Sequence, residues 1–194
     1  MILLEDDLPA GLRRIVRLMV KIKTVMVVIA LPILPITFFG VVFFRYILEQ
    51  DLFAYEEWLL PICFWIFFLS SAIGTYHGKQ INADLLDAVT DNHKIMWLRK
   101  MGVTALELII TLIILHWAWL MLAGEIADYP GWKTTIALKI PFIVPRLGIF
   151  VGFFFMALYS ALSLYLMWKV GPDRYVKAVQ ADKREIVEGG DVSW

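Results

Sequence analysis

The sequence predicts an all-α integral membrane protein with four transmembrane helices, and three observations support this prediction. Of the 194 residues, 60% are hydrophobic and 19% are charged, whereas a soluble domain is nearer half apolar and a quarter charged. The mean hydropathy is +0.73. The apolar residues are gathered into four long blocks with charge-rich segments between them, which is typical of a polytopic helical membrane protein. The blocks cover approximately residues 24–44, 58–76, 102–122 and 146–168, within a membrane domain of residues 24–169.

Residues 1–23 are predicted to form a cytoplasmic amphipathic segment. Between residues 8 and 22, apolar side chains recur at helical spacing and basic side chains occupy much of the remaining circumference. The apolar set is Leu8, Leu12, Ile15, Val16 and Met19, and the basic set is Arg13, Arg14, Arg17 and Lys21. Such a helix suits the surface of an anionic leaflet, so contact with membrane lipids is expected. The simpler interpretation is a charge cluster that only orients the first span.

The first span, residues 24–44, is long enough to cross the membrane, since about 21 residues rise about 31 Å. Its prolines, Pro32 and Pro35, predict a kink.

The second span, residues 58–76, carries small residues in its second half, including Ser70, Ser71 and Gly74. Small residues let membrane helices approach closely, so this face is a candidate interface. Residues 81–89, with Asp84 off their apolar stripe, are predicted to form a second short interfacial helix.

The third span, residues 102–122, contains two ionisable groups, Glu107 and His116. An ionisable group inside a span is a functional hypothesis by default. Glu107 is close enough to the cytoplasmic end for its side chain to reach the headgroups. The simpler interpretation is a packing residue held by Thr104, Thr111 or a partner helix, and for His116 a hydrogen bond between helices.

The fourth span, residues 146–168, begins with a GxxxG pattern formed by Gly148 and Gly152. Gly171 and Pro172 are expected to end its helix, and residues 170–194 form a polar cytoplasmic tail. Lys and Arg are concentrated in the N-terminal segment, the loop after the second span and this tail. The positive-inside rule therefore predicts that both termini are cytoplasmic.

Arg45, Glu56 and Glu57 form the densest charge group, and they meet at the predicted outer interface between the first two spans. One hypothesis is a bidentate pair between Arg45 and one glutamate, which leaves the other carboxylate for a partner. The alternative is a solvated hairpin with a positioning ion pair.

The sequence gives little support to catalysis or to bound cofactors. A bis-histidine haem needs two ligands at the same depth, and His77, His93 and His116 differ in predicted depth. The single Cys63 forms neither an internal disulfide nor a metal cluster. No nucleophile–base set, phosphate loop or metal spacing is recognisable, so an enzyme, a cofactor and a nucleic-acid partner are all unexpected.

At this point the order of motifs resembles a known family. An apolar span ends at Phe44-Arg45-Tyr46, Glu56-Glu57 follows a short connector, and an aromatic-rich span leads to a small-residue stretch. The remaining matches are Trp65, Phe68-Leu69, Ser71-Ala72, Gly78, Ile81, Asp84, Leu85-Leu86, Leu138-Lys139-Ile140-Pro141 and Pro145. This combination resembles the small membrane subunit (DctQ-like, small permease) of tripartite ATP-independent periplasmic (TRAP) transporters. Gln80 departs from the family, which often has a histidine there.

The resemblance implies a non-catalytic scaffold subunit in a multi-pass complex of the bacterial inner membrane. Its implied partners are a large polytopic membrane subunit, which carries the substrate and ion sites of a symporter, and a periplasmic solute-binding protein. The residues expected at a subunit or docking interface are Arg45, Glu56, Glu57, Ser70, Ser71, Gly74, Asp84, Gly148 and Gly152. Two alternatives remain open: a self-sufficient proton-coupled transporter that uses Glu107, and a haem or quinone membrane anchor.

Overall fold

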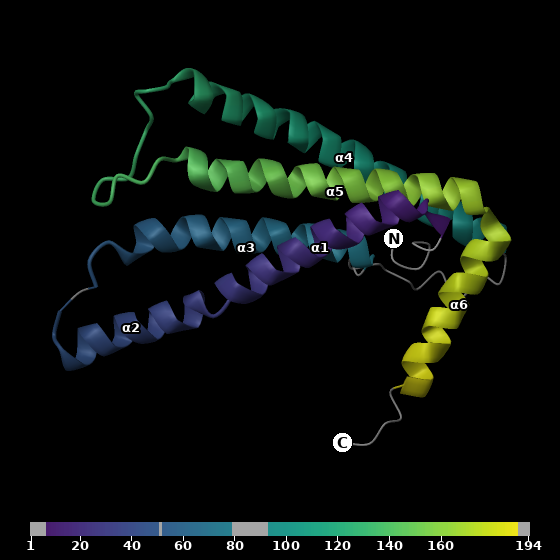
Figure 1. Cartoon of the computed structure of the whole chain (residues 1–194), viewed down its shortest axis with the longest axis horizontal. Coiled ribbons are helices and arrows are strands. Elements are labelled where there is room, and N and C mark those ends of the chain that lie inside the picture. The colour runs from purple at the N-terminus through teal and green to yellow at the C-terminus, as the bar shows by residue number, and fades with distance from the viewer. Residues whose placement is uncertain (1–6, 51, 79–92, 190–194) are drawn as a thin grey trace.

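The computed structural model describes residues 7–50, 52–78 and 93–189, and within them the chain forms six helices (Figure 1). They are α1 Ala10–Ala30, α2 Ile33–Ile47, α3 Tyr55–His77, α4 His93–Ala127, α5 Ile143–Val170 and α6 Pro172–Gly189. Four helical units are long and apolar enough to cross a membrane, and α1 with α2 makes the first of them. The number of predicted spans is therefore confirmed.

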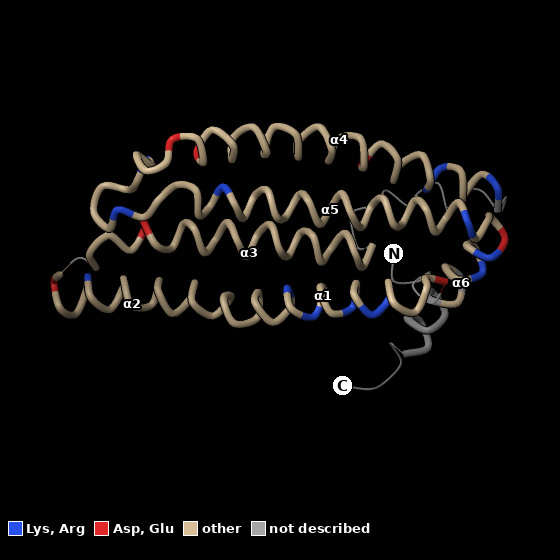
Figure 2. Tube along the Cα trace, turned by 45° about the horizontal axis from the view of Figure 1, so that its top comes forward, with Lys and Arg blue, Asp and Glu red and all other residues tan. Residues whose placement is uncertain are grey.

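The spans form a layer in which α5 lies between α4 and α3, while α2 lies on the far side of α3 and α1 crosses α3 to contact α5 (Figures 1 and 2). α1 runs against α3, whereas α2 diverges from it toward the opposite end of the layer. α6 turns steeply away from the end of α5. Lys, Arg, Asp and Glu gather toward the two ends of the layer, and the long middle section is largely uncharged (Figure 2).

α1 is one unbroken helix, with no break near residue 24, where the amphipathic segment was expected to meet the first span. The basic segment and the inner half of the first span share this helix, which ends only at Ala30. The break follows at Leu31 and Pro32 because Pro35 cannot donate to the carbonyl of Leu31, which instead accepts a 3.3 Å hydrogen bond from the Leu34 amide. The kink predicted from Pro32 and Pro35 is confirmed as this break between α1 and α2.

The third and fourth spans are longer at both ends than the sequence predicted. α5 ends at Val170, before Gly171 and Pro172, as expected. Gly171 has φ +79°, a conformation that suits glycine, and its amide donates to the Met167 carbonyl. Pro172 then begins α6, a helical part of the predicted tail.

Packing at the end of the layer next to α6 joins the N-terminal segment to α5 and α6. Leu8 is buried against Leu166 and Met167, and Asp7 forms a 2.7 Å ion pair with Arg174 of α6. On α4, the indole Nε1 of Trp97 donates a 3.0 Å hydrogen bond to the Met167 carbonyl. These contacts hold the ends of the spans next to α6 together.

Candidate functional site

The loop between α4 and α5 is attached to α3 through Glu57. The two carboxylate oxygens of Glu57 accept backbone hydrogen bonds from Ala137, at 2.9 Å, and from Leu138, at 2.7 Å. Because an ionised carboxylate strengthens such bonds, Glu57 fixes the position of the loop relative to the start of α3.

The loop also has internal order near this contact. The Thr135 amide donates to the Ile140 carbonyl, and the Phe142 amide donates to the Lys133 carbonyl, each at 3.0 Å. The Ile140 amide donates to the Thr135 hydroxyl. The loop is therefore a short folded hairpin and presents a defined surface at this end of the protein.

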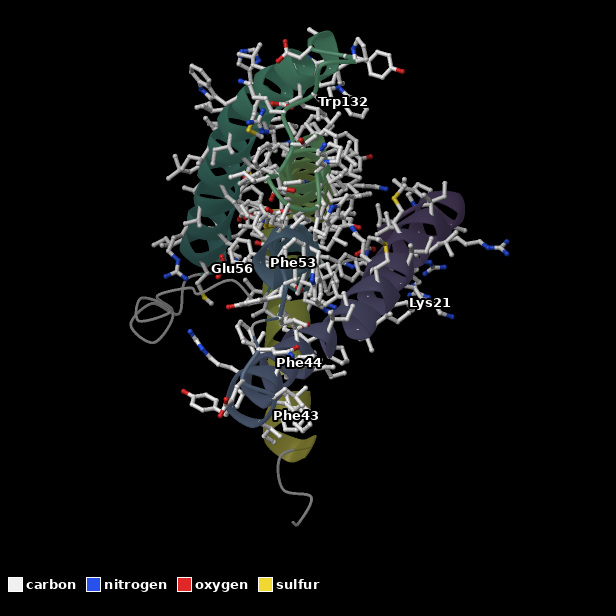
Figure 3. All side chains as sticks on the ribbon, turned by 90° about the vertical axis from the view of Figure 1, so that its left-hand side faces the viewer. Lys21, Phe43, Phe44, Phe53, Glu56 and Trp132 are labelled. Atoms are coloured by element: carbon white, nitrogen blue, oxygen red, sulfur yellow. The ribbon has the colours of Figure 1, made fainter. Side chains whose placement is uncertain are left out.

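The three charged residues that were predicted to meet between the first two spans have different surroundings in the structure. Glu57 binds the loop backbone, whereas the hypothesis reserved its carboxylate for Arg45 or for a partner. Arg45 and Glu56 are exposed, and Arg45 lies in the last turn of α2. Figure 3 looks onto this end and shows Phe43 and Phe44 on α2 well apart from Phe53 and Glu56 at the start of α3.

A buried ion pair, missed in the sequence, joins α4 to α5 near the same end. Nη1 of Arg146 donates to Oε1 of Glu125, whose residue is only 2% exposed. Oε2 of Glu125 and Nε1 of Trp132 are buried without hydrogen-bond partners among the described residues. The sequence does contain a signal for the inward position of Glu125. It lies about five helical turns after Glu107 and therefore shares the same face of α4.

A second polar layer crosses three helices in the half of the molecule that contains α1. Nζ of Lys23 on α1 donates to the hydroxyl of Tyr159 on α5 and lies 3.7 Å from the ring centroid of Phe155. Oγ of Ser160, the next residue of α5, donates a 2.9 Å hydrogen bond to Oε1 of Glu107 on α4. Adjacent residues on a helix project about 100° apart, so α5 reaches α1 with one side chain and α4 with the other.

Glu107 is thus held against α5 from within the chain. The simpler interpretation of Glu107 as a packing residue is supported, although its hydroxyl donor is Ser160 rather than Thr104 or Thr111. Thr111 instead donates to the Glu107 carbonyl at 2.7 Å. Lys23, at the end of the basic N-terminal segment, is only 3% exposed and is packed beside aromatic rings.

The two small-residue faces that were predicted as interfaces have different surroundings in the structure. Gly148 and Gly152 are buried against Trp65 and Phe68 of α3. A Cβ added at Gly152 would lie 2.5 Å from Cβ of Phe68, so this GxxxG pattern serves packing within the chain, a correction to its expected place at a subunit interface.

Ser70, Ser71 and Gly74 of α3 are only partly buried, and a Cβ added at Gly74 would meet no atom within 4 Å. This face remains a candidate for contact with another protein. Asp84 and the predicted helix of residues 81–89 lie outside the described residues.

His116 is exposed on α4, so the expected hydrogen bond between helices of this chain is not formed among the described residues. A second histidine, His77, is on the last turn of α3. Its ring lies beside that of Tyr76, with the ring centroids 5.1 Å apart. In the described part of the chain, no group of three or more His, Cys, Asp or Glu side chains is arranged to hold a metal ion.

A comparison with known protein families matches residues 33–170 to the family described as tripartite ATP-independent periplasmic transporters, DctQ component. The chain belongs to the DctQ family. The match begins at α2 and ends with α5, so it contains three of the four spans and the outer half of the first. A search of curated proteins finds no match.

Membership of the DctQ family makes this chain the small component of a TRAP transporter and a multi-pass membrane protein. The family is one of transporter components and not of enzymes. The fold and the family thus agree with the resemblance drawn from the Arg45, Glu56 and Glu57 motifs.

Proposed function

We propose that this chain is the fixed scaffold subunit of its transporter and does not itself carry solute. In this proposal it lies in the bacterial inner membrane with both termini cytoplasmic, and it holds the large subunit in place during ion-gradient-driven solute uptake. The outer loop held by Glu57 faces the periplasm, where the solute-binding protein docks.

The observation that supports this role best is how the polar groups inside the spans are used. Lys23 contacts Tyr159, Glu107 contacts Ser160, and Glu125 pairs with Arg146. Each contact joins α5 to a neighbouring span of the same chain. A transport path needs polar groups that are available to a solute or ion, whereas these groups hold helices together.

The distribution of apolar surface is consistent with a scaffold. α2 contacts the rest of the chain only sparsely, and Ile36, Phe39 and Tyr46 are largely exposed on it. Lipid covers such surface, and so does a larger membrane protein. A scaffold subunit requires broad apolar faces of this kind, because its contacts lie within the membrane.

The proposal is tested by purifying the tagged chain in mild detergent after co-expression with the large membrane subunit of its transporter. We expect the two proteins to co-purify at a fixed ratio. Recovery of this chain without the large subunit, under conditions where both are present in the membrane, would contradict the proposed role.

A further inference from the structure

His116 lies on the face of α4 that points away from the other spans. Residues nine positions apart on a helix project in opposite directions, since each residue turns the helix by about 100°. Glu107 and Glu125 lie nine positions to either side of His116, and both reach α5, through Ser160 and Arg146. The exposed imidazole therefore projects from the edge of the layer, where α4 is the outermost span (Figures 1 and 2).

The residues around His116 on this face are apolar and about half exposed. They are Ile109, Leu112, Ile113 and Leu120, and together with His116 we call them the α4 outer stripe. Within this stripe His116 is the only residue that carries a titratable side chain.

The depth of His116 makes its exposure informative. It lies about 14 Å along α4 from both Glu107 and Glu125, at 1.5 Å per residue. Within the predicted span of residues 102–122, His116 lies about 9 Å from the nearer end and about 21 Å from the other, so it lies inside the hydrocarbon core, which is about 30 Å thick. Imidazole always has at least one N–H to donate, and lipid tails offer no acceptor. A polar group in this position is strongly unfavourable unless another protein group meets it.

We propose that the α4 outer stripe is covered by a transmembrane helix of the large subunit, which supplies a hydrogen-bonding side chain to the His116 imidazole. This inference rests on the proposed function, because it requires that a larger membrane partner exists. Lipid headgroups lie outside the hydrocarbon core, about 9 Å or more along the helix from His116, which is beyond the reach of its short side chain. Two copies of this chain facing each other would share one hydrogen bond and leave one imidazole N–H without an acceptor.

The first experiment identifies what covers the stripe. A photo-crosslinking benzoylphenylalanine is placed at position 116 of the full chain in membranes that contain the large subunit, and at exposed Phe67 on α3 for comparison. A covalent product between position 116 and the large subunit supports the inference. Products formed at position 116 only with lipid or only with a second copy of this chain would overturn it.

The second experiment measures the hydrogen bond. We expect His116→Leu to lower the amount of large subunit that co-purifies by about 3- to 10-fold, the size of one interhelical hydrogen bond in a membrane. His116→Gln, which keeps a donor and an acceptor, should retain most of the interaction. Ile110→Leu changes an apolar residue on another side of α4 and should match the native chain.

Different results would contradict the proposed function and the inference about the α4 outer stripe. If the native chain recovers no large subunit, the proposed function and this inference are both wrong. If the native chain recovers it and His116→Leu recovers as much, only the inference about the α4 outer stripe is wrong. Folding of each variant is checked by its helix content in the same detergent.

Discussion

The ammonium group of Lys23 donates a hydrogen bond to the hydroxyl of Tyr159, and this contact attaches α1 to α5 within the apolar part of the molecule. Nζ also lies 3.7 Å from the Phe155 ring centroid and 4.2 Å from that of Tyr159. Aromatic faces attract a cation most strongly when water is excluded. Lys23 is therefore a structural residue that fixes the inner half of the first span, whereas α2 beyond the break has few such contacts.

Removing either partner of this contact should weaken the fold. Tyr159→Phe takes away the acceptor of a buried ammonium group, and we expect a loss of about 1–3 kcal/mol in the free energy of unfolding. Lys23→Met leaves the buried Tyr159 hydroxyl without its donor and should cost a similar amount. Unfolding is followed by helix content during titration of detergent micelles with dodecyl sulfate.

The double variant Lys23→Met/Tyr159→Phe distinguishes a coupled pair from two independent sites. Both polar groups are then absent, so the combined loss should be well below the sum of the single losses. Losses that add to within about 0.5 kcal/mol would show that the two side chains do not stabilise each other.

Close packing of α5 on α3 makes Gly152 sensitive to substitution. In Gly152→Ala the new Cβ would overlap with Cβ and the backbone of Phe68, and we expect a loss of about 1–3 kcal/mol in the free energy of unfolding. Gly40→Ala on α2 is the matched control, because its Cβ meets no atom within 4 Å, and it should stay within about 1 kcal/mol of the native chain. Equal stability of the two variants would contradict the tight α3–α5 contact.

Glu57 and its neighbour Glu56 should respond differently to loss of charge. Glu57→Gln removes one of two carboxylate acceptors, so the amides of Ala137 and Leu138 should exchange with deuterium several-fold faster. Glu56→Gln, at an exposed side chain, should leave this exchange unchanged. The measurement is hydrogen exchange of residues 133–142 by mass spectrometry, and unchanged exchange in Glu57→Gln would rule out its role in holding the loop.

The fold was largely predictable because membrane spans leave a strong signal in hydropathy. The four apolar blocks, the break near Pro32 and the end of α5 at Gly171 all follow from local chemistry. The helix continues through the expected boundary at residue 24 for a physical reason. An amphipathic basic segment and an apolar span are both helical, so nothing local separates them until a proline interrupts the hydrogen bonds.

The contacts of the polar residues were harder to predict because they depend on distant segments. Tyr159 lies 136 residues from Lys23 in sequence, and a tyrosine in an apolar span has no signal that names its partner. The Glu57 carboxylate binds backbone amides, which every residue but proline carries. Gly148 and Gly152 show the same limit, since a GxxxG pattern indicates a close helix contact but not whether the second helix belongs to the same chain.

The central claim is that the chain supports transport without carrying solute, and uptake by whole cells tests it most directly. Cells express the large subunit and the solute-binding protein with or without this chain, and they are given a panel of radiolabelled C4-dicarboxylates, sialic acid and other organic acids. We expect uptake of one or more of these solutes only when all three components are present, and none when this chain is expressed alone. Uptake at the native level without this chain, or uptake by this chain alone, would contradict the account.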